Sequence, residues 1–86
     1  MHYFYMVRCA DNSLYCGQTT DLKRRVEEHN SDDKRSAKYT KSRRPVKLVH
    51  SEQFTTASEA LKREYEVKQW SKLEKEKLVS GILKIS

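Results

Sequence analysis

The sequence predicts a small α+β fold, in which a three-stranded antiparallel sheet is flanked by helices in the order ββαβαα. Two observations support this fold class. Segments with the period of two that strands require occur near the N-terminus and in the middle of the chain, and segments with a helical period begin at capping residues. A chain of 86 residues has the length of one domain, so we expect a single domain over residues 1–86, with its core at about 2–79.

The first two strands are expected to form a hairpin. Residues 2–9 are rich in aromatic and β-branched side chains that alternate with a period of two. One side of this strand has Tyr3, Tyr5 and Val7, and the other has Phe4 and Met6. Turn-forming residues at 10–13 then allow residues 14–17 to return as the second strand.

A helix and a basic segment are expected next. Residues 19–21 favour a helix N-terminus, and an apolar stripe follows until Asn30. The positions that repeat with helical spacing are Leu22, Arg25, Val26 and His29. Residues 31–45 are polar and strongly basic with almost no apolar side chain, which predicts an exposed basic loop.

The third strand and two further helices complete the predicted order. The strand begins after Pro45, since proline is tolerated at the start of a strand. Residues 56–59 have the spacing of a capping box, which predicts a helix that runs through Trp70. Residues 71–74 repeat this spacing and predict a last short helix that ends near Gly81.

The composition favours nucleic acid as the partner. Lys and Arg number 18 against 12 Asp and Glu, so the formal net charge of this small chain is +6. Such a surplus also occurs in basic proteins that bind nothing specific.

No long apolar run indicates a signal peptide or a membrane span, so we expect a cytoplasmic protein in which Cys9 and Cys16 are reduced thiols.

Three ionisable residues do not fit a purely amphipathic pattern. Arg25 and His29 lie on the stripe of the first helix that must face the sheet, and Glu64 lies within the apolar face of the second long helix. In a structural interpretation, Glu64 pairs with Lys68 and Arg25 extends past the edge of the core. In a functional interpretation, the three residues converge on one site over the sheet.

The hairpin resembles a known nuclease signature. Tyr3-Phe4-Tyr5 and the later Tyr15-Cys16-Gly17 resemble the paired tripeptides of the GIY-YIG nuclease family. The resemblance continues through residues 18–25, 29–30 and 60–64, extends from Tyr3 to about Lys77, and is greatest to small stand-alone bacterial members. Tyr3 stands where the family has glycine and Cys16 where it has isoleucine, and both positions look structural.

The resemblance implies a metal-dependent endonuclease that hydrolyses phosphodiester bonds in DNA or RNA, with DNA favoured. Tyr5 resembles the general base, Arg25 the phosphate clamp, and Glu64 the ligand of one divalent cation, Mg²⁺ or Mn²⁺. Tyr15 and His29 would support the attacking water and the phosphate. Because a free tyrosine has a pKa of about 10, Tyr5 would need a nearby cation or hydrogen bond to lower its pKa.

The basic segment is a candidate surface for phosphates on either side of the cut. Its nucleic-acid contacts would be made by Lys38, Tyr39, Lys41, Arg43 and Arg44. The four cations would bind phosphates independently of sequence, and Tyr39 could stack on a base. The alternative is that this segment is only a solvated loop.

Two other functions stay open at this point. The same fold could be a nucleic-acid-binding module without useful turnover. A zinc-stabilised domain could instead use Cys9, Cys16, His29 and His50, although their spacing lacks the usual close cysteine pair. The sequence does not reveal the oligomeric state, so a monomer is the default expectation.

Overall fold

The computed structural model describes residues 1–81. Its elements are β1 (His2–Arg8), β2 (Leu14–Thr19), α1 (Leu22–Ser31), α2 (Lys38–Lys41), β3 (Lys47–Phe54), α3 (Ala57–Lys68) and α4 (Lys72–Ser80). The three strands form one antiparallel sheet in the order β2-β1-β3. The predicted α+β class and element order are therefore confirmed, with the short α2 as an addition.

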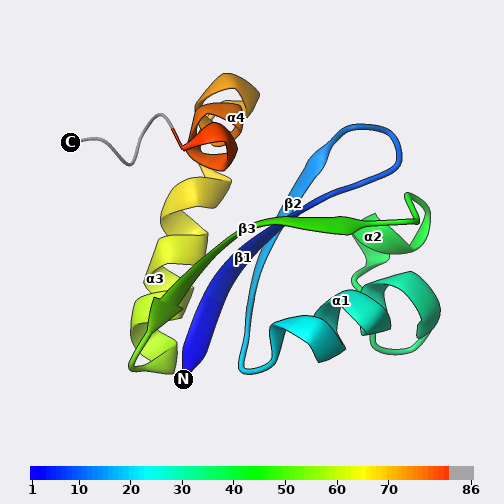
Figure 1. The fold of residues 1–86 in the computed structure, drawn as a ribbon, viewed down its shortest axis with the longest axis horizontal. Helices are drawn as coiled ribbons and strands as arrows, with labels where there is room; N and C mark the ends of the chain where they lie inside the picture. The colour runs from blue at the N-terminus through cyan, green and yellow to red at the C-terminus, as the bar shows by residue number, and fades with distance from the viewer. Residues whose placement is uncertain (82–86) are drawn as a thin grey trace.

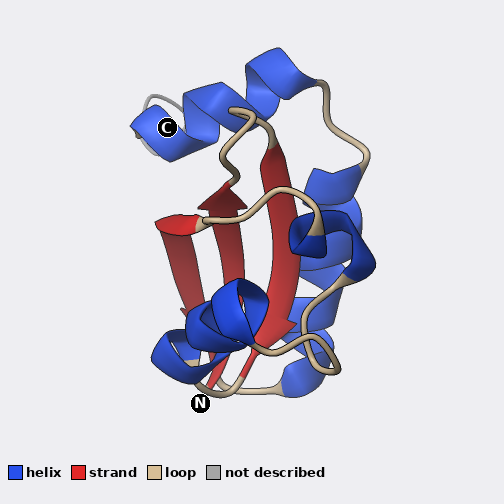
Figure 2. Cartoon of the chain, turned by 90° about the vertical axis from the view of Figure 1, so that its right-hand side faces the viewer, coloured by secondary structure: helices blue, strands red, loops and turns tan. Residues whose placement is uncertain are grey.

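β1 is the central strand of the sheet, and helices cover both faces of the sheet (Figure 1). Figure 1 shows α3 on one side of the sheet and α1 with α2 on the other, and Figure 2 views the sheet from the side of α1 and α2. In the register, Tyr5 lies opposite Gly17 of β2 and Ser51 of β3. This arrangement places the middle of the hairpin beneath α1.

The core is divided into two clusters by the sheet. The cluster beneath α3 and α4 contains Phe4, Met6, Cys16, Val67 and Leu78. The cluster on the α1 side contains Tyr5, Val7, Cys9 and Val46. The predicted alternation along the first strand is confirmed, since successive side chains of β1 enter different clusters.

The helix termini follow the predicted capping residues. The Asp21 side chain accepts a hydrogen bond of 3.1 Å from the Arg24 N–H at the start of α1. Ser71 and Glu74 form a complete capping box, and α4 ends at Gly81, whose φ of 88° is in the left-handed region. The helix predicted to run through Trp70 ends two residues earlier, at Lys68.

The prediction of an exposed loop over residues 31–45 is wrong in part. Residues 38–41 form α2, and Thr40 within it is fully buried. Arg44 is only partly exposed, because it donates hydrogen bonds to the His29 carbonyl at 2.7 Å and to Asp33 at 2.9 Å. Acceptors within the protein therefore bind a cationic side chain that the sequence pattern predicts to be exposed to solvent.

A search of residues 1–81 for a helix of sufficient length and apolar character to cross a membrane finds none.

Candidate active site

Tyr5 and His29 form a buried pair on the α1 side of the sheet. Tyr5 is 1% exposed and His29 is fully buried. The Tyr5 Oη and the His29 Nε2 are 2.7 Å apart. On the opposite side of the imidazole ring, Nδ1 lies 2.9 Å from the Thr40 Oγ1. Three elements, β1, α1 and α2, therefore contribute to one continuous hydrogen-bonded chain.

Gly17 provides the space that the Tyr5 phenol occupies. The two residues are direct partners across β1 and β2, so their side chains point to the same face of the sheet. A Cβ atom at position 17 would lie 2.5 Å from the Tyr5 Oη. Any larger residue at this position would displace the phenol from His29.

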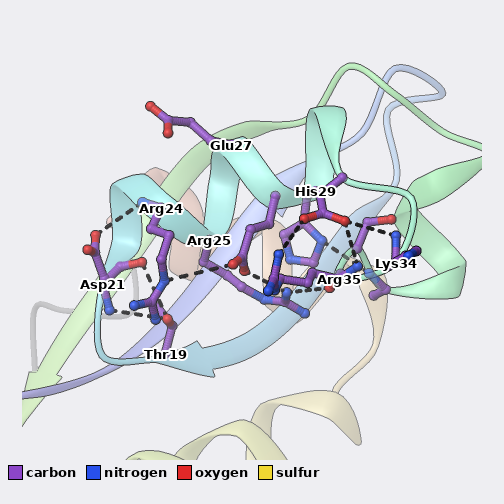
Figure 3. Close-up of polar contacts among 12 residues, drawn as sticks. Thr19, Asp21, Arg24, Arg25, Glu27, His29, Lys34 and Arg35 are labelled. Atoms are coloured by element: carbon purple, nitrogen blue, oxygen red, sulfur yellow. Dashed lines mark hydrogen bonds and ion pairs between the residues drawn. The ribbon is translucent and has the colours of Figure 1, made fainter.

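Arg25 is the cation beside this pair, and Figure 3 shows it close to His29 and Arg35. Its Nη1 donates to the Glu28 Oε1 at 3.1 Å and to the main-chain oxygen of Arg35 at 2.6 Å. These two bonds use both hydrogens of Nη1 and fix the plane of the guanidinium. The Arg25 charge is also near enough to Tyr5 to oppose a rise in the pKa of its phenol.

Burial controls the protonation of both members of the pair. Burial raises the pKa of Tyr5 to about 12, although the adjacent Arg25 guanidinium acts in the opposite direction. Burial also lowers the pKa of His29 to about 4, and the charge of Arg25 adds to this effect. The expected cation is therefore next to Tyr5, but it does not outweigh burial. At neutral pH the phenol is protonated and the imidazole is uncharged.

Tyr15 links the buried pair to the surface of α2. Its ring is 5.4 Å from the His29 ring in an edge-to-face arrangement, and 5.9 Å from the nearly parallel ring of Tyr39. The Arg43 guanidinium lies 3.9 Å from the centre of the Tyr39 ring. A base that stacks on Tyr39 would therefore compete with Arg43 or Tyr15 for that ring.

Glu64 lies at the β2 edge of the site. Its carboxylate forms an ion pair of 2.7 Å with Lys68, its side chain is 16% exposed, and its charge adds to the raised pKa of Tyr5. The Lys68 ammonium is in turn 5.7 Å from the centre of the Tyr15 ring. The structural interpretation of Glu64 and the functional one are thus both compatible with its position.

The donor set fits a cation that needs few protein ligands. Within residues 1–81, no group of three or more His, Cys, Asp or Glu side chains could enclose a metal ion. Mg²⁺ is commonly held by one or two carboxylates, with water and phosphate oxygens as its other ligands, so Glu64 alone meets that minimum. Lys68 pairs with Oε2 of this carboxylate, so Oε1 is the oxygen that a cation could bind without displacing Lys68.

The cations of the basic segment divide into two kinds. Arg43 pairs with Asp11 at 3.0 Å, and Arg44 pairs with Asp33, so these two arginines link segments of the protein to each other. Lys38 and Lys41 are exposed and form no ion pair within the described part of the chain. Of the predicted phosphate contacts, these two lysines are the ones immediately accessible to a ligand.

The accessible surface extends beyond the basic segment to α4. Tyr39 borders two adjoining hollows. The first is lined by Lys38, Tyr39, Lys41, Ser42 and Arg43, and the second by Ser13, Leu14, Tyr39, Lys72 and Lys75. We call these two hollows, which share Tyr39, the Tyr39 groove. Lys72 and Lys75 were not predicted as site residues, because nothing local in the sequence relates α4 to the hairpin.

Thr40 is the buried site residue that the sequence pattern does not reveal. A hydroxyl in a polar, basic segment has no periodic signal, so its contact with His29 appears only when α2 packs on α1.

The structure contradicts the alternative of a zinc-stabilised domain. Cys9 and Cys16 lie in clusters on opposite faces of the sheet, and His50 is bonded to Glu52 at 2.7 Å.

Comparisons with known proteins point to one family. Residues 1–77 match the model of the GIY-YIG catalytic domain. The chain is 54% identical to a UPF0213 protein of Staphylococcus saprophyticus, with 92% of this chain and 94% of the relative covered. It is 51% identical to a UPF0213 protein of Halobacterium salinarum, with 91% of this chain and 99% of the relative covered.

Two solution NMR structures have a similar fold. The UPF0213 protein BH0048 from Bacillus halodurans is 46% identical with a TM-score of 0.59, and the alignment covers 92% of this chain and 82% of that one. The protein EF2693 from E. faecalis is 40% identical with a TM-score of 0.63, and the alignment covers 99% and 88%. By sequence and by fold, the chain belongs to the GIY-YIG domain family.

Proposed function

We propose that this protein is a metal-dependent endonuclease that hydrolyses phosphodiester bonds, with DNA as the favoured substrate, and that residues 1–86 act as one domain. The main observation in support is the buried pair of Tyr5 and His29 with the Arg25 guanidinium beside it. A neutral polar pair of this kind contributes little to a small core, whereas an oxygen flanked by a cation suits proton transfer next to a phosphate.

Arg25 would bind the scissile phosphate. Its Nη1 is already held by Glu28 and by the Arg35 carbonyl, so the guanidinium is oriented before substrate arrives. The remaining N–H donors are left for Tyr5 and for a phosphate oxygen. Orientation of this kind reduces the reorganisation that the transition state requires.

Tyr5 would act as the general base in its phenolate form. The phenolate oxygen takes a proton from water, the water oxygen forms a bond to phosphorus, and the bond from phosphorus to the leaving oxygen breaks. Glu64 would hold the divalent cation, which when bound supplies positive charge to stabilise the leaving oxygen. Tyr15 would limit the space around the water through its contacts with His29 and Tyr39.

The Tyr39 groove would bind the strand on either side of the cut. Lys38 and Lys41 from α2 line one of its hollows and Lys75 from α4 lines the other. Contacts of lysines with phosphates do not depend on sequence. We therefore expect affinity without strong sequence preference and with a marked decrease at high salt.

A cleavage assay tests this proposal directly. Labelled single-stranded, duplex and branched DNA and RNA are incubated with the protein in Mg²⁺ or Mn²⁺ at low salt. We expect Glu64→Ala and Tyr5→Phe each to reduce cleavage by about 100-fold or more. The matched control is Glu66→Ala, which removes an exposed carboxylate from the same helix and should leave cleavage unchanged.

A nucleic-acid-binding module without turnover is the second candidate function. Two observations favour it: burial raises the pKa of Tyr5, and Lys68 pairs with the carboxylate that would bind the metal. Salt-sensitive binding by the intact protein, together with no cleavage of any of these substrates in either metal, would support this second function and contradict the first.

A further inference from the structure

The short helix α2 and its N-cap residue, Ala37, provide the partners of the His29 nitrogen that faces away from Tyr5. The Thr40 Oγ1 lies 2.9 Å from Nδ1, and the main-chain N–H of Ala37 points at the same nitrogen from 3.4 Å. His29 and Thr40 are both fully buried, so water does not replace either partner. The protonation of the ring is therefore determined by these two groups and by Tyr5.

The main-chain N–H of Ala37 restricts the ring to one tautomer. A backbone N–H can only donate, and its direction is fixed by the start of α2, so Nδ1 must present its lone pair to it. Neutral imidazole has one proton, which then resides on Nε2. The burial that makes His29 a weak base also keeps the ring neutral.

The Thr40 hydroxyl can reinforce this choice. Its single hydrogen has two acceptors within reach, the Nδ1 of His29 at 2.9 Å and the Ala37 carbonyl at 3.0 Å. The Ala37 carbonyl already accepts a hydrogen bond from the Lys41 N–H at 3.0 Å. A carbonyl oxygen can accept two hydrogen bonds, so the Ala37 carbonyl and Nδ1 compete for the hydroxyl hydrogen. Because the Ala37 N–H requires a lone pair on Nδ1, the Thr40 hydroxyl can donate to Nδ1 at 2.9 Å but cannot accept from it.

We propose that Thr40, with the Ala37 N–H, is a positioning residue that holds neutral His29 with its proton on Nε2, so that His29 donates a hydrogen bond to the Tyr5 oxygen. This inference rests on the proposed nuclease function for its purpose. With the proton on Nε2, the ring donates a hydrogen bond to the Tyr5 oxygen and stabilises its phenolate form. With the proton on Nδ1, the bare Nε2 would accept a hydrogen bond from the Tyr5 hydroxyl and stabilise the protonated phenol instead.

The tautomer can be measured without any enzymatic assay. In protein labelled with ¹⁵N at histidine, a protonated ring nitrogen of His29 and an unprotonated one have distinct chemical shifts. We expect a protonated Nε2 and a bare Nδ1 in the unmodified protein. A protonated Nδ1 would overturn the inference, whatever the outcome of the cleavage assay.

Substitutions at Thr40 test its own contribution. Thr40→Val keeps the shape of the side chain but removes the hydroxyl, so the Nδ1 resonance should move toward that of an unbonded nitrogen, and Thr40→Ser should restore it. Where the intact protein cleaves, we expect Thr40→Val to reduce kcat by about tenfold with little change in KM. Thr40→Ser should recover most of that loss.

The exposed Thr55→Val variant is the control, and it should match the intact protein in both measurements. An unchanged Nδ1 resonance in Thr40→Val, or an unchanged kcat alongside normal cleavage by the intact protein, would overturn the role of Thr40. If the intact protein cleaves nothing, the proposed function fails while the tautomer measurement still decides this inference.

Discussion

At the scale of single residues, the phenol of Tyr5 is subject to two opposed effects. Burial raises its pKa to about 12, while Arg25 and a donor on His29 favour its ionised form. The ionised fraction at neutral pH is therefore small. Turnover in this site should depend on how far the bound phosphate and cation, together with pH, change that fraction.

The first prediction concerns the pH dependence of cleavage. The phenolate fraction rises tenfold for each pH unit below a pKa of about 12, so the logarithm of the cleavage rate should rise with pH between about 7 and 9. Rates measured at constant Mg²⁺ across this range check the slope. A rate that is already independent of pH below about 8 would contradict Tyr5 as the titrating base.

The second prediction concerns Gly17. The Cβ of Gly17→Ala would lie 2.5 Å from the Tyr5 Oη, so the phenol must move away from His29. We expect cleavage to fall by at least tenfold and the free energy of unfolding to fall by about 1–3 kcal/mol. Assays of cleavage and of urea denaturation measure the two effects.

Gly81→Ala is the matched control for this substitution. Gly81 has a φ of 88°, and no atom of residues 1–81 lies within 4 Å of its Cβ direction, so alanine there strains the end of α4 without touching the site. It should reduce stability by about 1 kcal/mol and leave the cleavage rate per folded molecule unchanged. Equal loss of cleavage in both variants would show that Gly17 has no special role.

At the scale of secondary-structure elements, α1 and α2 together bury an imidazole that must stay neutral. The pKa of His29 is about 4 in the folded protein and about 6.5 in an unfolded chain. Between these values the unfolded chain binds a proton that the folded protein does not. Stability from this group is therefore complete above pH 6.5 and is lost as pH falls toward 4.

The third prediction follows from this difference. The free energy of unfolding should fall by roughly 2 kcal/mol between pH 7.5 and pH 5, a range in which most carboxylates are still ionised. Urea denaturation at the two pH values measures the change. His29→Asn should lose most of this dependence, and a stability that does not vary between the two values in the intact protein would contradict a buried neutral His29.

Prediction from the sequence succeeded for elements with strong local signals. Alternation along β1, the caps at Asp21 and Ser71, and the left-handed terminus at Gly81 were all recognisable. It failed for α2, because a single helical turn has no repeat to detect and its partner, the imidazole of His29, lies in another element.

At the scale of the whole molecule, the accessible lysines lie on α2 and α4, two helices that are far apart in the sequence. The Tyr39 groove receives Lys38 and Lys41 from α2 and Lys75 from α4, whereas Arg43 and Arg44 are occupied by acidic partners. Net charge therefore overstates the number of cations that a ligand can contact, and the fold determines which ones remain accessible.

The fourth prediction tests this distribution. Lys75→Glu should weaken binding to a labelled DNA strand by about three- to tenfold at low salt, and it should reduce the salt dependence by roughly one phosphate contact. The control is Lys77→Glu, an exposed position on the same helix that does not line the Tyr39 groove. The same loss of affinity in both variants would indicate a general charge effect and contradict a binding surface in the groove.

Alternation, capping and the paired tripeptides are local features of the chain, so the fold class and the family could be predicted without coordinates. Three further properties appear only in the folded chain: burial raises the pKa of Tyr5, Gly17 makes room for its phenol, and Thr40 contacts His29. These properties depend on distances between residues far apart in the chain and on the exclusion of water, which no local pattern encodes.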